Sequence, residues 1–180
     1  MQPQTGTFLM AHPLLDDGNF ARCVVLLTEH NDDGTVGLVL NRPSEYTLSQ
    51  ALVGSWPDWP LNLGGPVGTD SLFFLHLRPD LISGGNEVLP GVFFGGSLDD
   101  VQRAAESKAL SAEDVLFAAG YSGWSVGQLQ AELDEGSWVI QHSMVRADWW
   151  QQADLYQHWA KRWPEDLKLW LNSPELPYWN

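Results

Sequence analysis

A long apolar run near the start of the chain predicts a buried strand and a β-hairpin. Residues 22–29 are apolar almost throughout, as expected for a strand inside a sheet. His30 to Gly34 are then rich in Asn, Asp and Gly, which tolerate the left-handed backbone conformations of tight turns. Residues 35–41 predict the returning strand, and residues 6–12 predict a strand before the hairpin. The start of the chain is therefore predicted to form three strands.

Short strands and short helices mix irregularly through the rest of the chain. Further strands are predicted at residues 61–63, 71–77, 87–89, 91–94, 115–119 and 138–141. Helices are predicted at residues 47–53, 97–109, 125–134, 148–163 and 165–171. The helices at residues 47–53 and 125–134 begin with capping-box patterns. Pro43 is expected to end the strand of residues 35–41. Because a regular β-α-β alternation is missing, the order predicts an α+β fold rather than a doubly wound sheet.

Length and composition fit a single folded domain. The chain has 180 residues, of which 44% are hydrophobic, enough for a core of its own. We expect residues 1–180 to form one domain, with residues 146–180 as a Trp-rich helical extension packed on it. That extension holds six of the ten tryptophans, and its helical spacing of apolar residues favours packing in the core. A protein interface is the second interpretation, because Trp is enriched at binding hot spots.

The charge of the chain argues against several classes of partner. Nine Lys and Arg stand against 23 Asp and Glu, a formal charge of −14, and the basic residues form no stripe. Direct binding to nucleic acid or to an anionic membrane is disfavoured, because both depend on clustered Lys and Arg. No signal peptide is expected, and no apolar run approaches the ~18 residues of a membrane span. A single cysteine, Cys23, allows no internal disulfide, so a cytoplasmic location is expected.

Arg42 and Arg22 are the candidate anion-binding residues. Arg42 lies in Asn41-Arg42-Pro43, where its guanidinium could hold a carboxylate or a phosphate at the mouth of a pocket. Alternatively, it satisfies loop carbonyls and has a structural role. Arg22 carries the same two interpretations. If both arginines lie on neighbouring strands, their charges converge on one anion.

The segment Gly120-Tyr121-Ser122-Gly123-Trp124 is the second candidate. Tyr121 and Trp124 each combine an aromatic ring with a polar group, so they could line a small-molecule pocket. The segment is expected to lead into a helix. At the start of that helix, Gln128 is expected to reach back to the amide of Ser125.

Two further residues belong to this candidate pocket. Gly65, in Gly64-Gly65-Pro66, is expected in a tight turn where backbone approaches backbone closely. His30 either faces the pocket or hydrogen-bonds the turn. The candidate pocket comprises Arg22, His30, Asn41, Arg42, Pro43, Gly65, Tyr121, Trp124 and Gln128.

No residue pattern indicates a metal, a cofactor or a reaction. The five His lack the spacing of zinc ligands, so no metal site is expected. Gly95-Gly96-Ser97 precedes a helix, but Asp99 and Asp100 already occupy the positive end of that helix, which disfavours a phosphate. Ser122 and Ser125 lack a nucleophile-elbow motif. We therefore expect no cofactor and favour a role without catalysis.

Five sequence segments follow one another in an order that is specific in combination. They are GTFLMAHP at residues 6–13, VVLLTEH at 24–30 with NRP at 41–43, GGPV at 64–67, FGG at 94–96, and GYSGW at 120–124 with GQL at 127–129, Glu132 and Trp138. With these segments the chain resembles the YqgE/AlgH family of bacterial proteins over residues 6–142. From about Arg146 onward the resemblance ends.

The resemblance implies mostly structure. It implies a single α+β domain with a mixed, bifurcated β-sheet and a small closed barrel, flanked by helices. It implies no established catalytic activity, and one branch of the family is described as a regulator of alginate production.

We therefore expect a non-catalytic regulatory protein that acts through a protein partner or a small ligand. The alternative is an enzyme acting on a small anionic metabolite, with Arg22 and Arg42 as anion clamps. A direct transcriptional regulator is a third interpretation, which the charge of −14 disfavours. The sequence leaves the oligomeric state and the identity of the ligand open.

Overall fold

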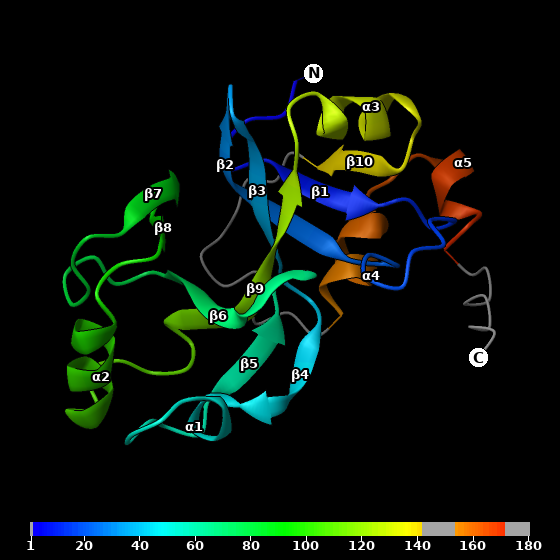
Figure 1. The fold of residues 1–180 in the computed structure, drawn as a ribbon. Coiled ribbons are helices and arrows are strands. Elements are labelled where there is room, and N and C mark those ends of the chain that lie inside the picture. The colour runs from blue at the N-terminus through cyan, green and yellow to red at the C-terminus, as the bar shows by residue number, and fades with distance from the viewer. Residues whose placement is uncertain (1, 142–153, 172–180) are drawn as a thin grey trace.

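The computed structural model of this chain describes residues 2–141 and 154–171. Its strands form a branched sheet, in which strand β9 (Val115–Trp124) belongs to both branches (Figure 1). The end of β9 pairs antiparallel with β3 (Gly34–Val39). Earlier along its length, β9 pairs in parallel with β5 (Pro60–Leu63) and antiparallel with β6 (Val67–His76). The two branches of the sheet therefore meet at β9.

Each branch continues through further strands. On one side, β3 is followed in order by β2 (Val24–Asn31), β1 (Phe8–Ala11) and β10 (Trp138–Gln141), all antiparallel. On the other side, β6 is followed by β8 (Val92–Phe94) and β7 (Asn86–Leu89), and β5 pairs with β4 (Pro43–Thr47). The α+β class, the β2–β3 hairpin and the bifurcated sheet are thus confirmed.

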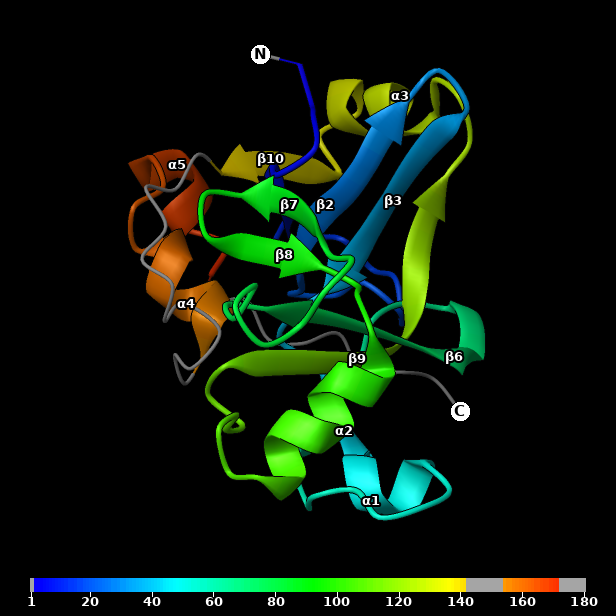
Figure 2. The ribbon, with the colours of Figure 1, turned by 90° about the vertical axis from the view of Figure 1, so that its left-hand side faces the viewer.

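The prediction of a small closed barrel is wrong, because the sheet is open. A barrel requires the first and last strands to hydrogen-bond to each other. Here β10 and β7 stand at opposite ends of the strand order. The β7–β8 hairpin folds back in front of β2 (Figure 2), where Val88 and Val92 join the same buried cluster as Phe8 and Leu26. Side-chain packing thus takes the place of hydrogen-bonded closure.

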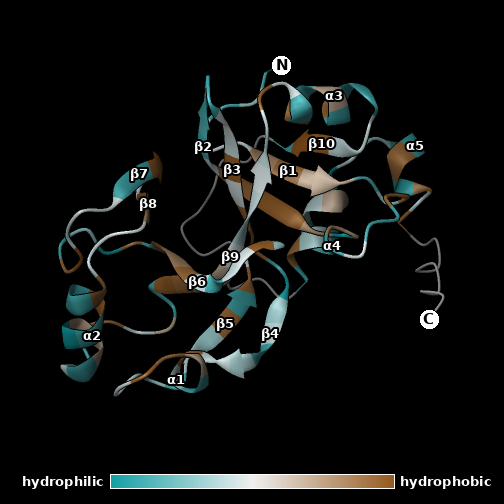
Figure 3. Cartoon of the chain, viewed as in Figure 1, coloured by the Kyte–Doolittle hydropathy of each residue, from teal (hydrophilic) through white to brown (hydrophobic). Residues whose placement is uncertain are grey.

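Helices cover both faces of the sheet. They are α1 (Leu48–Ala51), α2 (Leu98–Glu106), α3 (Gln128–Asp134), α4 (Leu155–Ala160) and α5 (Glu165–Lys168). Alternation along β1 sends Phe8 to the cluster that contains α4 and Leu9 to the cluster that contains α3. Val101 of α2 packs in a third cluster, and α2 turns a hydrophilic face outward (Figure 3). In the described residues, no helix is both long and apolar enough to cross a membrane.

Two helix starts follow the capping chemistry expected from the sequence. The Gln50 side chain accepts a hydrogen bond from the Thr47 amide at 2.9 Å before α1. Before α3, the Gln128 side chain accepts from the Ser125 amide at 3.0 Å. Each bond satisfies a backbone donor that the helix itself leaves without a partner.

Three local predictions differ from the structure. The strand before Pro43 ends earlier than predicted, at Val39. Pro43 itself begins β4, and because β4 pairs on one side only, it tolerates a residue without an amide hydrogen. The strand predicted over residues 115–119 is longer, because residues 120–124 continue β9. The helix expected over 148–163 is α4, which begins only at Leu155, and residues 148–153 lie outside the described residues.

Helix α4 and the residues that follow it are anchored in the core. Trp159 and Trp163 are 3% and 4% exposed, and the Trp159 ring meets Phe8 edge-on with 4.7 Å between centroids. The hydroxyl of Tyr156 donates to the carbonyl of Ala11 at 2.7 Å. These contacts support core packing for this part of the Trp-rich segment. Other tryptophans of the segment lie outside the described residues: Trp149, Trp150 and Trp179.

Candidate functional site

Residues of the predicted pocket lie at both ends of the β2–β3 hairpin. Arg22 and Arg42 lie at the end where β2 begins, whereas His30 lies beside the turn. At the rise of an extended strand, Arg22 and His30 are roughly 25 Å apart. Trp124 pairs with Thr35 and so belongs to the turn end. The structure therefore does not bring these residues around one cavity.

Arg42 is bound to the loop that precedes β2. Its Nη1 donates to the carbonyl oxygens of Gly18 and Asn19 at 2.9 and 2.5 Å, and its Nη2 donates to that of Ala21 at 3.2 Å. Backbone carbonyls thus accept from three of the five guanidinium N–H groups, and the side chain is directed at the loop. This geometry supports the structural interpretation of Arg42.

Asn41 extends the strand pairing beside Arg42. Its Oδ1 accepts from the Val24 amide at 2.8 Å, and its Nδ2 donates to the Arg22 carbonyl at 3.0 Å. Arg22 itself has a φ of 53°, a left-handed conformation that a non-glycine residue adopts at some cost. Pro43 pairs with Asn62 in the β4–β5 ladder. This end of the hairpin is therefore held by backbone-directed bonds.

Replacing Arg42 with alanine should lower the free energy of unfolding by about 2 kcal/mol, because three loop carbonyls lose their donor. For a chain of this size, the midpoint of thermal unfolding should fall by roughly 4–8 °C. Arg42→Lys should recover little, since one ammonium cannot reach all three carbonyls. Arg103→Ala, at a side chain that is 75% exposed, is the matched control and should leave the midpoint unchanged. An Arg42→Ala variant as stable as this control would contradict the structural role.

Two cavities flank the turn of the β2–β3 hairpin. The first has a volume of about 350 Å³ and is lined by residues that include Glu29, Asn31, Asp33, Tyr121 and Trp124. The second has a volume of about 330 Å³ and is lined by residues that include His30, Asp32, Ser125 and Gln130. Among the described residues, no lysine or arginine lines either cavity. The turn end of the hairpin is correspondingly hydrophilic (Figure 3).

Polar side chains on the hairpin are held to one another. His30 Nδ1 lies 2.6 Å from Thr35 Oγ1, directly across the strand pair. The Asn31 side chain donates to Glu29 at 2.6 Å, and its Oδ1 accepts from the Asp33 amide at 2.8 Å. Exposed carboxylates thus stand on a turn with a fixed shape.

The two aromatic residues of the predicted pocket have different roles. Trp124 is 5% exposed, and its indole nitrogen donates to Glu132 at 2.8 Å, so its ring belongs to the core. Tyr121 is half-buried and meets Phe73 edge-on at 5.5 Å between centroids. Gly65 packs against the backbone of Tyr121, as the expected close approach requires. Of these residues, Tyr121 is the aromatic side chain that the first cavity can offer to a ligand.

The Cys23 thiol and the Ser97 hydroxyl, two other groups that could take part in chemistry, have structural roles. Burial raises the pKa of the Cys23 thiol to about 12, so it stays protonated and is a poor nucleophile. Ser97 Oγ accepts from the Asp100 amide at 3.2 Å and caps α2, the role that competes with phosphate binding there. Among the described residues, no group of three or more His, Cys, Asp or Glu is arranged to hold a metal ion.

Comparison with known proteins identifies a family. The family model described as AlgH-like matches residues 8–168. The chain belongs to the AlgH-like family. A UPF0301 protein of Chlorobaculum tepidum is 38% identical over 183 residues, covering 97% of this chain and 95% of the relative. A UPF0301 protein of Parabacteroides distasonis is 33% identical over 184 residues, covering 99% of this chain and 92% of the relative.

Solved structures share the AlgH-like fold. A crystal structure of a protein from Corynebacterium diphtheriae aligns with a TM-score of 0.76 and 22% identity, covering 94% of this chain and 92% of that one. The solution structure of the AlgH protein from Pseudomonas aeruginosa aligns with a TM-score of 0.63 and 34% identity, covering 79% and 82%. The names of these proteins state no activity, so the function of an AlgH-like chain has to be argued from its site.

The AlgH-like match corrects one prediction, and the structure adds residues that the predicted pocket lacks. The match extends to residue 168, so the view that the resemblance ends near Arg146 is wrong. Glu29 and Asp33 were not among the predicted pocket residues, although the period-two alternation of a strand places Glu29 and Asn31 on one face. Glu132 belongs to the AlgH-like motif, but nothing in the sequence shows which side chains it contacts.

Proposed function

We propose that this AlgH-like protein is a non-catalytic binding protein whose protein partner presents Lys or Arg side chains to the turn end of the β2–β3 hairpin. One observation carries the proposal. Two cavities flank the turn, and Glu29, Asp32 and Asp33 border them without a basic residue among the described lining. Such a surface attracts a basic partner and speeds its encounter, and the net charge of −14 adds to that attraction.

The other interpretations have less support. An enzyme that clamps an anionic metabolite needs the guanidinium of Arg42, which donates to three loop carbonyls instead. Direct regulation by DNA binding needs a basic surface, and the charge of the chain is −14. A regulatory role through a protein partner is consistent with both observations.

The proposal is tested with a short Lys- and Arg-rich peptide and amide chemical-shift mapping by NMR. We expect shifts at residues 29–36 and 121–126. The double variant Glu29→Gln/Asp33→Asn should bind the peptide about five-fold more weakly, because two exposed ion pairs together contribute about 1 kcal/mol. Binding should also weaken as the ionic strength rises.

The matched control removes the same number of charges at the far end of the molecule. Asp99→Asn/Glu106→Gln changes two exposed acids on α2, which lies opposite the hairpin turn (Figure 2). It should bind the peptide as the unchanged protein does. Equal losses in the two double variants, or shifts spread evenly over the surface, would show that only the net charge matters and would reject this site.

A further inference from the structure

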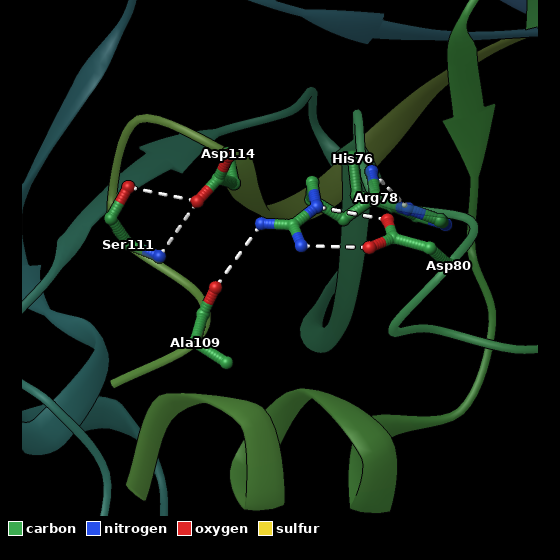
Figure 4. Close-up of polar contacts among 6 residues, drawn as sticks. All are labelled: His76, Arg78, Asp80, Ala109, Ser111 and Asp114. Carbon is green, nitrogen blue, oxygen red and sulfur yellow. Dashed lines mark hydrogen bonds and ion pairs between the residues drawn. The ribbon is translucent and has the colours of Figure 1, made fainter. Parts of the chain in front are cut away.

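His76, the last residue of β6, is a buried imidazole with one nitrogen left without a partner. The residue is 0% exposed, and its ring stacks on Phe93 at 5.4 Å between centroids. Nδ1 accepts a hydrogen bond from the Arg78 amide at 3.3 Å, which places the proton of the neutral ring on Nε2 (Figure 4). Nε2 has no hydrogen-bond partner among the described residues.

Two glycine-containing loops close over this nitrogen. We call residues 82–86 and 95–97 together the clasp. The Ser97 amide donates to the Ser83 carbonyl at 2.8 Å, and the amide and hydroxyl of Ser83 donate to Asp100 at 3.0 and 2.6 Å. Gly85 comes so close that a Cβ there would lie 2.7 Å from His76 Nε2. The clasp therefore shuts the ring off from solvent and connects β7, β8 and α2.

The carboxylates around His76 are already bonded to other groups. The charged side chains of the elements packed around the ring are Arg78 and Asp80 after β6, Glu87 in β7, Asp100 in α2 and Asp114 before β9. Asp80 is bonded to Arg78, and Asp114 is bonded to Ser111 (Figure 4). Glu87 accepts from the Gly91 amide, and Asp100 is bonded to Ser83 and Arg103. None of these carboxylates bonds to His76, whose Nε2 has no hydrogen bond of good geometry among the described residues. Burial holds the pKa of His76 below its ordinary value and outweighs the backbone of Gly95, which favours the charged ring. A protonated ring would thus be a poorly compensated buried charge.

We propose that His76 makes the clasp pH-sensitive, so that protonation of its imidazole opens the clasp locally while β1, β2, β3 and β10 stay folded. A proton on Nδ1 faces the Arg78 amide hydrogen, so that bond is lost. The ring then moves toward water, which requires residues 82–86 and 95–97 to separate. The inference is independent of the partner site at the hairpin turn.

The direction with pH follows from the two states of the clasp. In the closed state, burial holds the pKa of His76 below its ordinary 6.5. In the open state the ring meets water and regains that ordinary value. The open state therefore binds protons more readily, and the closed clasp loses stability as the pH falls through 6.5. If the closed form binds no proton, opening rises by up to about 30-fold between about pH 7.5 and 5.0.

Hydrogen exchange of single amides tests the proposal, using protection factors corrected for the intrinsic effect of pH. We expect protection in the clasp to fall as the pH is lowered to 5, with little change in residues 24–27. His76→Phe keeps an aromatic ring but cannot titrate, so its clasp should show no such fall. His30→Gln, at an exposed histidine, is the matched control and should behave like the unchanged protein.

Several outcomes would overturn the proposal. They are constant protection of the clasp in the unchanged protein, an equal fall in the His76→Phe variant, or a parallel fall in residues 24–27. Should His76→Phe fail to fold, His76→Gln serves in its place. An NMR titration of the His76 ring in the unchanged protein decides independently, because a pKa at or above 6.5 would rule out the mechanism.

Discussion

Replacing Gly65 with alanine is expected to cost about 4 kcal/mol of folding free energy or to prevent folding. A Cβ at this position would lie 2.3 Å from both the carbonyl carbon and the carbonyl oxygen of Tyr121, and Gly65 has a φ of +151°. Because the obstructing atoms belong to the backbone of β9, no side-chain rotation can relieve the contact.

Gly65 lies beside the point where the sheet branches. The neighbouring Gly64 donates its amide to Ala119 at 2.7 Å, and its carbonyl accepts from the Val39 amide at 2.8 Å. These bonds join the loop after β5 to β9 and to β3 at once. A shift of the loop to accommodate a side chain would therefore disturb both branches of the sheet.

Urea unfolding of Gly65→Ala and Gly91→Ala measures this effect against a matched control. Gly91 also has a positive φ, +77°, but no atom lies within 4 Å of an added Cβ. Its substitution should cost only the backbone strain, about 1 kcal/mol. If Gly65→Ala proves no more costly than Gly91→Ala, close backbone approach is not what the branch point requires.

Secondary-structure elements could be predicted where the residues that determine them lie within one short segment of the sequence. In the β2–β3 hairpin, an apolar run leads into a turn of Asn, Asp and Gly. The turn fixes which residues of the two strands pair, from Val25 with Val39 to Asn31 with Gly34. The bond from Ser125 to Gln128 could be expected because a capping box spans only four residues. The strand over residues 120–124 could not be predicted in this way, because two glycines among five residues are typical of a loop. These residues form a strand because they pair with β3 and β6, which are distant in the sequence.

The candidate site could be predicted only in part, for the same reason. Tyr121 and Trp124 are neighbours in the sequence, and the first cavity does include both. Whether Arg22 and Arg42 converge on an anion depends on where each side chain points. The structure directs Arg42 to the loop before β2, which no periodicity in the sequence could show.

The residues that carry the family resemblance mostly hold the architecture together. Asn41 and Arg42 fix the loop before β2, and Gly65 allows the sheet to branch. Trp124 and Gln128 both bind Glu132. Glu29 belongs both to the VVLLTEH segment of the resemblance and to the lining of the first cavity, so the proposed site adjoins this framework.

Glu132 joins α3 to two strands through a single carboxylate. Its Oε2 accepts from the indole nitrogens of Trp124 and Trp138 at 2.8 and 2.7 Å, and its Oε1 accepts from Gln128 at 2.9 Å. The two indole rings meet edge-on at 5.8 Å between centroids, and each tryptophan is 5% exposed. Removing the carboxylate would leave two indole donors in the core without their acceptor.

Glu132→Ala is therefore expected to lower the free energy of unfolding by about 3 kcal/mol. The midpoint of thermal unfolding, followed by near-ultraviolet circular dichroism of the tryptophans, should fall by roughly 6–12 °C. Glu132→Gln keeps one oxygen that both indoles can reach, so it should lose only about 1 kcal/mol. Glu135→Ala removes an exposed acid at the end of the same helix and should change the midpoint little. A Glu132→Ala variant as stable as Glu135→Ala would mean that packing of the indole rings, rather than their shared acceptor, holds α3 to the sheet.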